Sequence, residues 1–504
     1  MSSEQKLETL KERLRTVADI RGAAHVLGWD QSTYMPPGGA EARGRQLATL
    51  ESLAHEKFID PEVGRLLDAL APLEADLPYD SDDASLLRVA RRDFEKASKV
   101  PSKFLATFSE HVAKSYGLWA EARPDNDFAK VSAALQTTLD YSRELSQFFP
   151  GFDHIADPLI DNADEGMTVA ALRPLFADLR AELVPIVEKI SAQGETDESV
   201  LKGHFPEAEQ LAFGLKLAKA FGYDLKRGRQ DKTLHPFAVN FSVNDVRITT
   251  RVKEDDVSEC LSSTLHEAGH AMYEQGISQS LEGTLLANGT SSGIHESQSR
   301  LWENQVGRSR GFWEHTFPKL QKTFPDLENV ALDDFYRAIN KVSRSLIRTD
   351  ADEVTYNLHV IIRFDLELAL LEGKLAVKDL PEAWRERYRS DLGIASENDT
   401  NGVLQDVHWF AGTVGGAFQG YTLGNILSAQ FYEAALSAHP SIPKEVGEGK
   451  FSTLHGWLKD NIYSHGRKFT SPELIERATG QGMTIQPYVN YLKAKYGELY
   501  NLGS

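Results

Sequence analysis

The chain has 504 residues, 41% of them hydrophobic, and a formal net charge of −19 at pH 7. A chain of this length can bury a large core, and its acidic charge argues against nucleic acids and anionic membranes as partners. Its one cysteine, Cys260, excludes an internal disulfide, which fits a reducing cytoplasm.

The N-terminus is typical of the charged start of an amphipathic helix and not of a secretory signal. No apolar run approaches the length of a membrane span. We therefore expect a cytoplasmic protein without a membrane partner.

Helical periodicity dominates the chain, so the fold should be mainly α. Apolar residues recur at helical spacing in three clear stripes: Leu7, Leu10, Leu14, Val17 and Ile20; Val131, Leu135 and Leu139; Leu172, Leu175, Leu179 and Leu183. Polar breaks at 74–83 and 193–202 are typical of loops between helices, and no segment is long enough to mark a domain boundary. We expect one catalytic unit over residues 1–504, either as one body or as two helical lobes around a cleft.

The clearest exception to helix is the segment 234–252. Residues 234–242 and 246–252 are rich in β-branched and aromatic side chains, and the Asn-Asp pair between them favours a turn, which together predict a hairpin. An exposed edge strand here could hold an extended peptide through main-chain hydrogen bonds. A purely structural flap explains the same pattern equally well.

The strongest chemical signal follows directly, in a predicted helix that begins after Asp255 or Asp256 and ends at Gly276. His266 and His270 are four residues apart, so they share one face and their rings can converge on one Zn²⁺. Glu267 lies between them as a candidate general base. The histidines fall opposite the apolar stripe of this helix, which indicates a wet cleft or solvent on that side. Cys260 lies about one and a half turns before His266 and is interpreted as a packing residue.

Two histidines leave a zinc site short of one protein ligand. Glu296, expected in the first turn of a second helix, is the candidate third ligand. His295 competes with it but points about 100° away. Glu303, two turns further along the same face, fits better as a residue that orients a ligand imidazole.

Two further clusters follow. Arg348 and Asp352 have the i,i+4 spacing of a helical ion pair, with Tyr356 one turn beyond. Such a pair is usually solvated, but if it faces a cleft, the guanidinium can grip a carboxylate through two parallel hydrogen bonds. The segment 402–424 combines many glycines with aromatic residues, and for His408 within it a structural role is the more economical interpretation.

Together these segments resemble, in order, the six signature motifs of the Taq-type metallocarboxypeptidases, peptidase family M32. The motifs are His-Pro-Phe at 235–237, Asp-Val-Arg-Ile-Thr at 245–249, the two-histidine motif at 266–270, His-Glu-Ser-Gln at 295–298, Ile-Arg-Thr-Asp-Ala-Asp at 347–352, and the segment 402–409. The opening segment 27–43 also looks like that family. One departure is the run 415–421, where a Phe-Pro-Ser-Tyr-like sequence is expected, although Tyr421 is retained.

The resemblance implies a large helical, gluzincin-type peptidase with a deep central groove, usually a homodimer, that removes single residues from peptide C-termini. The family is broad in specificity, disfavours a C-terminal Pro, and uses zinc or cobalt. Carried to this sequence, its pattern makes His266, His270 and Glu296 the metal ligands, Glu267 the catalytic carboxylate, and Arg348 the binder of the substrate's terminal carboxylate.

The expected mechanism has Glu267 taking a proton from an activated water and returning it to the leaving amine. His408 or Tyr421 would donate a hydrogen bond to the oxyanion. Gln405, His235 and Arg247 are candidate helpers of the substrate carboxylate site. Two alternatives stay open: an oligoendopeptidase of similar helical fold, and a non-catalytic peptide-binding protein with a relict metal site.

Overall fold

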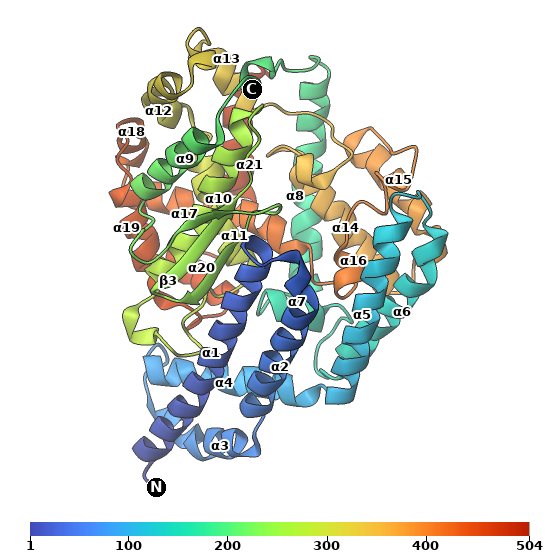
Figure 1. Ribbon diagram of the computed structural model, residues 1–504, viewed down its shortest axis with the longest axis vertical. Coiled ribbons are helices and arrows are strands. Elements are labelled where there is room, and N and C mark those ends of the chain that lie inside the picture. Colours follow the sequence, from blue (N-terminus) through green and yellow to red (C-terminus); the bar gives the residue numbers. More distant parts are fainter. Residues whose placement is uncertain (503–504) are drawn as a thin grey trace.

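The computed structural model describes residues 1–502 and is built almost wholly of helices around one small sheet (Figure 1). The first half of the chain forms α1 (Ser3–Thr33), α2 (Ala40–Phe58), α3 (Pro61–Asp76), α4 (Asp82–Lys99), α5 (Ser102–Ala122), α6 (Ala129–Gln147), α7 (Asp157–Ala163), α8 (Val169–Ser191) and α9 (Glu207–Phe221). The sheet precedes α10 (Val257–Gly276), α11 (Ser292–Arg300), α12 (Arg310–Thr323), α13 (Leu332–Ile339), α14 (Tyr356–Leu371), α15 (Leu380–Leu392) and α16 (His408–Ala411). The C-terminal helices are α17 (Gln419–Ala438), α18 (Ile442–Gly447), α19 (Ser452–Asn461), α20 (Ser471–Thr479) and α21 (Gln486–Leu499). The predicted mainly helical class is confirmed.

The three predicted stripes lie inside helices α1, α6 and α8. In α1, Leu7, Leu10, Leu14 and Val17 are buried, and they pack with α3, α4 and residues 277–287 in a smaller core separate from the main one. The main core collects the apolar faces of α6, α8 and the helices that follow the sheet. Apolar periodicity therefore located the buried faces correctly.

The sheet confirms the predicted hairpin and adds one strand to it. Strands β2 (Ala238–Ser242) and β3 (Asp245–Thr250) are antiparallel, and the turn at Val243 and Asn244 lies one residue before the predicted Asn-Asp pair. β1 (Gln230–Lys232) pairs in parallel with the other edge of β3. It was missed because its three polar residues carry no strand pattern. The side chains of Val246 and Ile248 are fully buried, on the face of β3 that packs against the main core.

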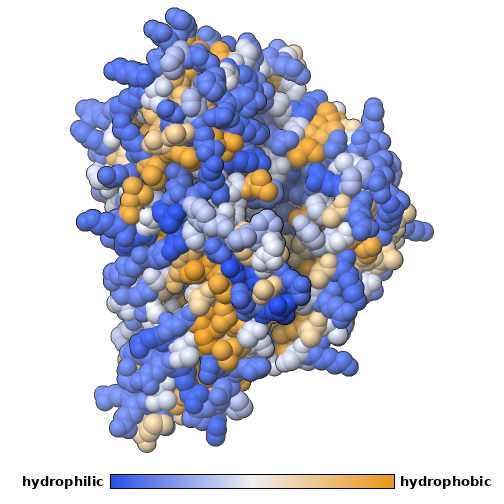
Figure 2. All heavy atoms as spheres, viewed as in Figure 1, coloured by the Kyte–Doolittle hydropathy of each residue, from blue (hydrophilic) through white to orange (hydrophobic). Residues whose placement is uncertain are grey.

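Segments far apart in sequence combine into parts that flank the centre of the molecule. In Figure 1, α5 and α6 (cyan) lie beside α14, α15 and α16 (orange) on the right, while α9, α10, α17 and the sheet lie on the left. Figure 2 shows the surface hollowed along the boundary between these two parts. None of the helices in residues 1–502 is long and apolar enough to cross a membrane.

Helix α11 lies pressed between α10 and α17. A Cβ on Gly269 of α10 would lie 2.6 Å from the carbonyl oxygen of Gln298, and one on Gly424 of α17 would lie 2.6 Å from Cβ of Glu296. Both positions therefore need glycine for the backbones to approach. The start of α11 is fixed as well, because the buried Asp164 carboxylate accepts a hydrogen bond from the backbone N–H of Gly293, at 2.6 Å.

Candidate active site

Helix α10 begins and ends where the sequence predicted. Asp256 is the N-cap, and its carboxylate accepts a hydrogen bond from the N–H of Ser258. The face opposite the apolar stripe is not open to solvent, since Glu267 and Glu274 are only 6% exposed. That face of α10 lines a buried polar site. Cys260 is fully buried beside Thr250, in agreement with a packing role.

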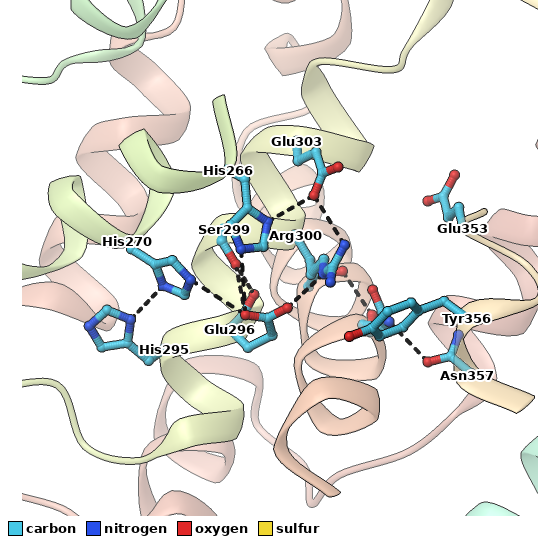
Figure 3. A network of polar contacts seen from close by, with 12 residues as sticks. His266, His270, His295, Glu296, Ser299, Arg300, Glu303, Glu353, Tyr356 and Asn357 are labelled. Carbon is cyan, nitrogen blue, oxygen red and sulfur yellow. Dashed lines mark hydrogen bonds and ion pairs between the residues drawn. The ribbon is translucent and has the colours of Figure 1, made fainter. Parts of the chain in front are cut away.

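The side chains of His266, His270 and Glu296 converge (Figure 3). One Glu296 oxygen, Oε2, lies 3.7 Å from Nε2 of His266 and 3.4 Å from Nε2 of His270. Ligand atoms bound tetrahedrally to zinc at its usual bond lengths are roughly 3.3 Å apart. The donor types and spacing therefore fit a zinc ion with one coordination position left for water or substrate. This is a group of residues that could hold a metal ion.

The segment carrying Glu296 differs from the prediction. Ser291 is the N-cap and α11 starts at Ser292, so Glu296 lies in the second turn and not in the first. Ser292 and Gly293 are already helical. Directly after α11 the chain forms a π-helix over Leu301–Val306, in which the N–H of Gly307 donates to the carbonyl of Trp302 at 2.9 Å.

The π-helix brings Glu303 to the back of the metal site. Its Oε2 lies 2.9 Å from Nδ1 of His266, so Glu303 orients this imidazole as predicted. Arg300 donates to Glu296 Oε1 at 2.7 Å and to Glu303 Oε2 at 3.2 Å, and Arg308 donates to the other Glu303 oxygen. Burial opposes ionisation of Glu296, but the charges of Arg300 and His266 hold its pKa well below the usual range.

Glu267 lies beside these donors in a buried position, and burial raises its pKa to about 7. A carboxyl group with a pKa near neutrality can both accept and return a proton at physiological pH, as a general acid–base catalyst must.

His295 does not point into the donor set. Its ring lies behind His270, with the two Nδ1 atoms 2.5 Å apart (Figure 3). Its Nε2 lies 2.8 Å from Oε1 of Glu274.

Arg348 is not half of a helical ion pair with Asp352, so this prediction is wrong. Residues Arg348–Asp350 form one 3₁₀ turn and α14 begins only at Tyr356, which removes the helical spacing. Asp352 instead accepts backbone N–H groups of Ser343, Val354 and Thr355. The predicted proximity of Tyr356 is correct, since Arg348 Nη1 donates to its hydroxyl at 2.9 Å.

The true partner of Arg348 is Asp406, at 2.9 Å from Nη2 to Oδ1. Gln405 supports the turn, because its side-chain oxygen accepts the backbone N–H of Arg348 at 3.0 Å. A second arginine, Arg363, lies behind them: its Nε is 2.5 Å from Asp406 Oδ2, and its Nη2 donates to Gln405 at 2.8 Å. Two guanidinium groups around one carboxylate leave this cluster with a net charge of +1.

Sequence reasoning missed Arg363. It is fully buried in the middle of α14, among Val360, Ile361, Ile362 and Phe364. An arginine buried at such a position needs an acidic partner. The charge of Arg363 within an apolar helical run was therefore a signal that could have identified it. The sequence offered no means of naming Asp406 as that partner.

His408 and Tyr421 both adjoin this cluster. The His408 ring packs against Phe418, with centroids 4.5 Å apart, and its Nδ1 lies 3.6 Å from Asp406 Oδ1. Burial lowers the pKa of His408 to about 4, so the ring is neutral at pH 7. The Arg348 guanidinium lies 5.2 Å from the centre of the Tyr421 ring, and burial raises the pKa of this phenol to about 12, which keeps its hydrogen in place as a donor.

Arg247 and His235 lie in a different setting. Arg247, on β3, is held by both oxygens of Asp245, and its guanidinium lies 4.4 Å from the Trp29 ring centre. His235 is exposed in the loop between β1 and β2. The contacts of Arg247 with Asp245 and Trp29 tie it to the sheet and to α1, and neither of them joins it to the Arg348 cluster.

Comparison with known proteins agrees with this geometry. The sequence profile of the family described as carboxypeptidase Taq (M32) metallopeptidase matches residues 9–496. The chain is 40% identical to thermostable carboxypeptidase 1 of Thermus thermophilus, over 99% of this chain and all of that protein. It is 35% identical to carboxypeptidase 1 of Bacillus subtilis, over 97% of each chain.

The structure of an M32 carboxypeptidase from Deinococcus radiodurans superimposes with a TM-score of 0.96 at 51% identity, covering 99% of this chain and all of that one. A carboxypeptidase from Pyrococcus furiosus gives a TM-score of 0.94 at 33% identity, covering 97% of this chain and 99% of that one. The chain therefore belongs to the M32 family and is a metallocarboxypeptidase, a hydrolase that acts on peptides.

Proposed function

We propose that the protein is a zinc-dependent carboxypeptidase that releases single amino acids from peptides with a free C-terminus. The observation that carries this is the position of Tyr356 between the two charged clusters. Its hydroxyl accepts from Arg348, while its ring packs against Arg300, whose guanidinium lies 4.8 Å from the ring centre and holds metal ligand Glu296. The carboxylate-binding arginine and the metal donors are thus held at a fixed separation through one side chain.

Such a separation selects the terminal peptide bond. A carboxylate bound at Arg348 anchors the last residue, and the bond before it is then presented to the metal donors. The net charge of +1 on Arg348, Asp406 and Arg363 favours an anionic terminus over an amide. We assign Arg348 to this clamp, with Gln405 holding the Arg348 backbone. His235 and Arg247, first expected to help at the same clamp, are proposed instead as contacts to the rest of the peptide.

The roles of the chain's own residues follow from their positions. When bound by His266, His270 and Glu296, zinc would lower the pKa of a coordinated water and polarise the scissile carbonyl. Glu267 accepts a proton from the attacking water and passes it to the leaving amine. His408, neutral at pH 7, and Tyr421 are the two candidate donors to the developing oxyanion.

Several further features of the proposal rest on family resemblance. They are broad specificity with poor cleavage of a C-terminal Pro, cobalt as a working substitute for zinc, and a homodimer. A single catalytic unit over residues 1–504 and a cytoplasmic location are proposed from the sequence itself, because it has no clear domain boundary and only one cysteine. The acidic charge of the chain supports the absence of nucleic-acid partners.

The test is hydrolysis of an N-blocked dipeptide and its C-amidated twin by zinc-loaded protein, followed by mass spectrometry. We expect cleavage of the free acid and little of the amide. Equal cleavage of both, or cuts within longer peptides blocked at both ends, would favour an oligoendopeptidase, and no cleavage of any peptide would favour a relict binding protein.

Glu267→Gln gives the matched active-site control. It should keep zinc bound at one equivalent per chain but lower kcat by at least about a hundredfold, because the proton acceptor is lost. A variant that keeps its activity would remove Glu267 from the mechanism.

A further inference from the structure

The two ligand histidines are supported in different ways. His266 has an ionised carboxylate directly behind it, Glu303, which two arginines hold in place. His270 has another imidazole behind it, that of His295. An imidazole can orient a ligand histidine as a carboxylate does only if its own ring orientation and the position of its hydrogen are fixed.

The hydrogens of this pair can be counted from the contacts. His270 must present a bare Nε2 to a metal, so its hydrogen is on Nδ1. Nδ1 of His295 lies 2.5 Å away and must therefore accept that hydrogen. With Nδ1 acting as the acceptor, His295 carries its own hydrogen on Nε2, and this atom lies 2.8 Å from Glu274 Oε1, which accepts it. With the hydrogens placed in this way, both the His270–His295 bond and the His295–Glu274 bond have one donor and one acceptor.

Glu274 is in turn held on both oxygens. Besides His295, Oε1 accepts the backbone N–H of Gly289 at 3.0 Å, and Oε2 accepts the side-chain N–H of Asn240 at 2.7 Å. Asn240 belongs to β2, so the chain of bonds ends in the hairpin. The His295 ring has little room to turn, because a Cβ on Gly289 would lie 2.6 Å from its Cδ2, and the Tyr273 ring packs against it.

From this geometry we propose that His295 is a positioning residue that holds the His270 imidazole in its metal-binding tautomer and orientation, through the path Asn240, Glu274, His295, His270. The inference rests on the proposed metal site. It makes Asn240, in the middle of β2, part of the support of the metal centre, in addition to any role of the hairpin toward peptides.

Two substitutions of one residue test the path. His295→Leu fills the space but can neither accept nor donate, whereas His295→Gln keeps an amide oxygen for His270 and an amide N–H for Glu274. His315→Leu, which removes a histidine on α12 whose polar neighbour is Lys319, is the matched control. Zinc affinity is measured by competition with a chromogenic chelator, and the coordination geometry by the visible absorption spectrum of the cobalt-loaded protein.

We expect His295→Leu to weaken zinc binding about 10- to 100-fold, the usual cost of losing a residue that orients a metal ligand, and to change the cobalt spectrum. His295→Gln should recover most of the affinity and the native spectrum, and His315→Leu should match wild type. Native affinity and spectrum in His295→Leu, or a His295→Gln protein as impaired as His295→Leu, would overturn the proposal. If wild type itself bound no zinc, the proposed function would fail instead.

Discussion

In the proposed carboxylate site, the charge balance around Asp406 should let Arg363 influence the binding of substrates that it does not touch. Replacing it by Met leaves Asp406 paired with Arg348 alone, so the net charge of the cluster falls from +1 to zero. A substrate carboxylate bound at Arg348 would be separated from Arg363 by two ion pairs, a distance that we take as about 8 Å. At an effective dielectric constant of about 20, the positive charge of Arg363 then contributes roughly 2 kcal/mol to binding of that carboxylate, or about 30-fold in affinity.

The assay is the ratio of kcat/KM for an N-blocked dipeptide to that for its C-amidated twin, measured below the melting temperature of each variant. Arg363→Met should lower the ratio about 30-fold, chiefly through KM of the free acid. Arg385→Met, which removes another arginine of the same part of the molecule that pairs with Asp399, should leave it unchanged. The electrostatic reasoning is refuted if Arg363→Met keeps the wild-type ratio while Arg348→Ala loses it.

Two other positions give predictions of different kinds. Gly424→Ala should weaken zinc binding at least tenfold, because the added Cβ displaces Glu296, whereas Gly456→Ala in α19, with no atom near its Cβ, should bind zinc normally in the same chelator titration. Burial raises the pKa of Glu367 to about 7 from 4.5, so between these values the folded chain binds more protons than the unfolded chain and stability falls as pH rises. Glu367→Gln should remove about 3 kcal/mol of this loss of unfolding free energy. Its urea midpoints should then differ less between pH 5 and pH 8 than those of wild type. An unchanged pH dependence would rule out Glu367 as the source of the loss.

Sequence reasoning succeeded where the signal was local. The bounds of α10 follow from its cap and its apolar stripe, and the turn between β2 and β3 follows from the Asn-Asp pair, because both depend on neighbours within a few residues. It failed where a local spacing was taken as a contact. Arg348 and Asp352 are four residues apart in sequence, yet the backbone between them is not helical. Arg348 pairs with Asp406, 58 residues away, and Asp352 accepts a hydrogen bond from Ser343, 9 residues away.

The least predictable part of the candidate site was its buried support. Glu303 was predicted to orient a ligand imidazole because of its helical spacing from Glu296. In the structure a π-helix, which no residue pattern predicted, places Glu303 beside His266. Arg363 and the orientation of His295 depend on side chains that meet only after folding. Residue types and spacing single out the candidate metal donors, whereas the groups that orient these donors meet them only through tertiary packing.

The close fit of α11 between the glycine faces of α10 and α17 bears on how the protein acquires its metal. The two helices that supply ligands, α10 and α11, are held together by the backbone approach at Gly269, and the bond from Asp164 fixes the start of α11. Small zinc domains fold only around their metal, so that loss of the ion is loss of the structure. In this protein, backbone contacts also hold together the helices that carry the candidate ligands, so we expect removal of the metal by a chelator to leave the fold intact.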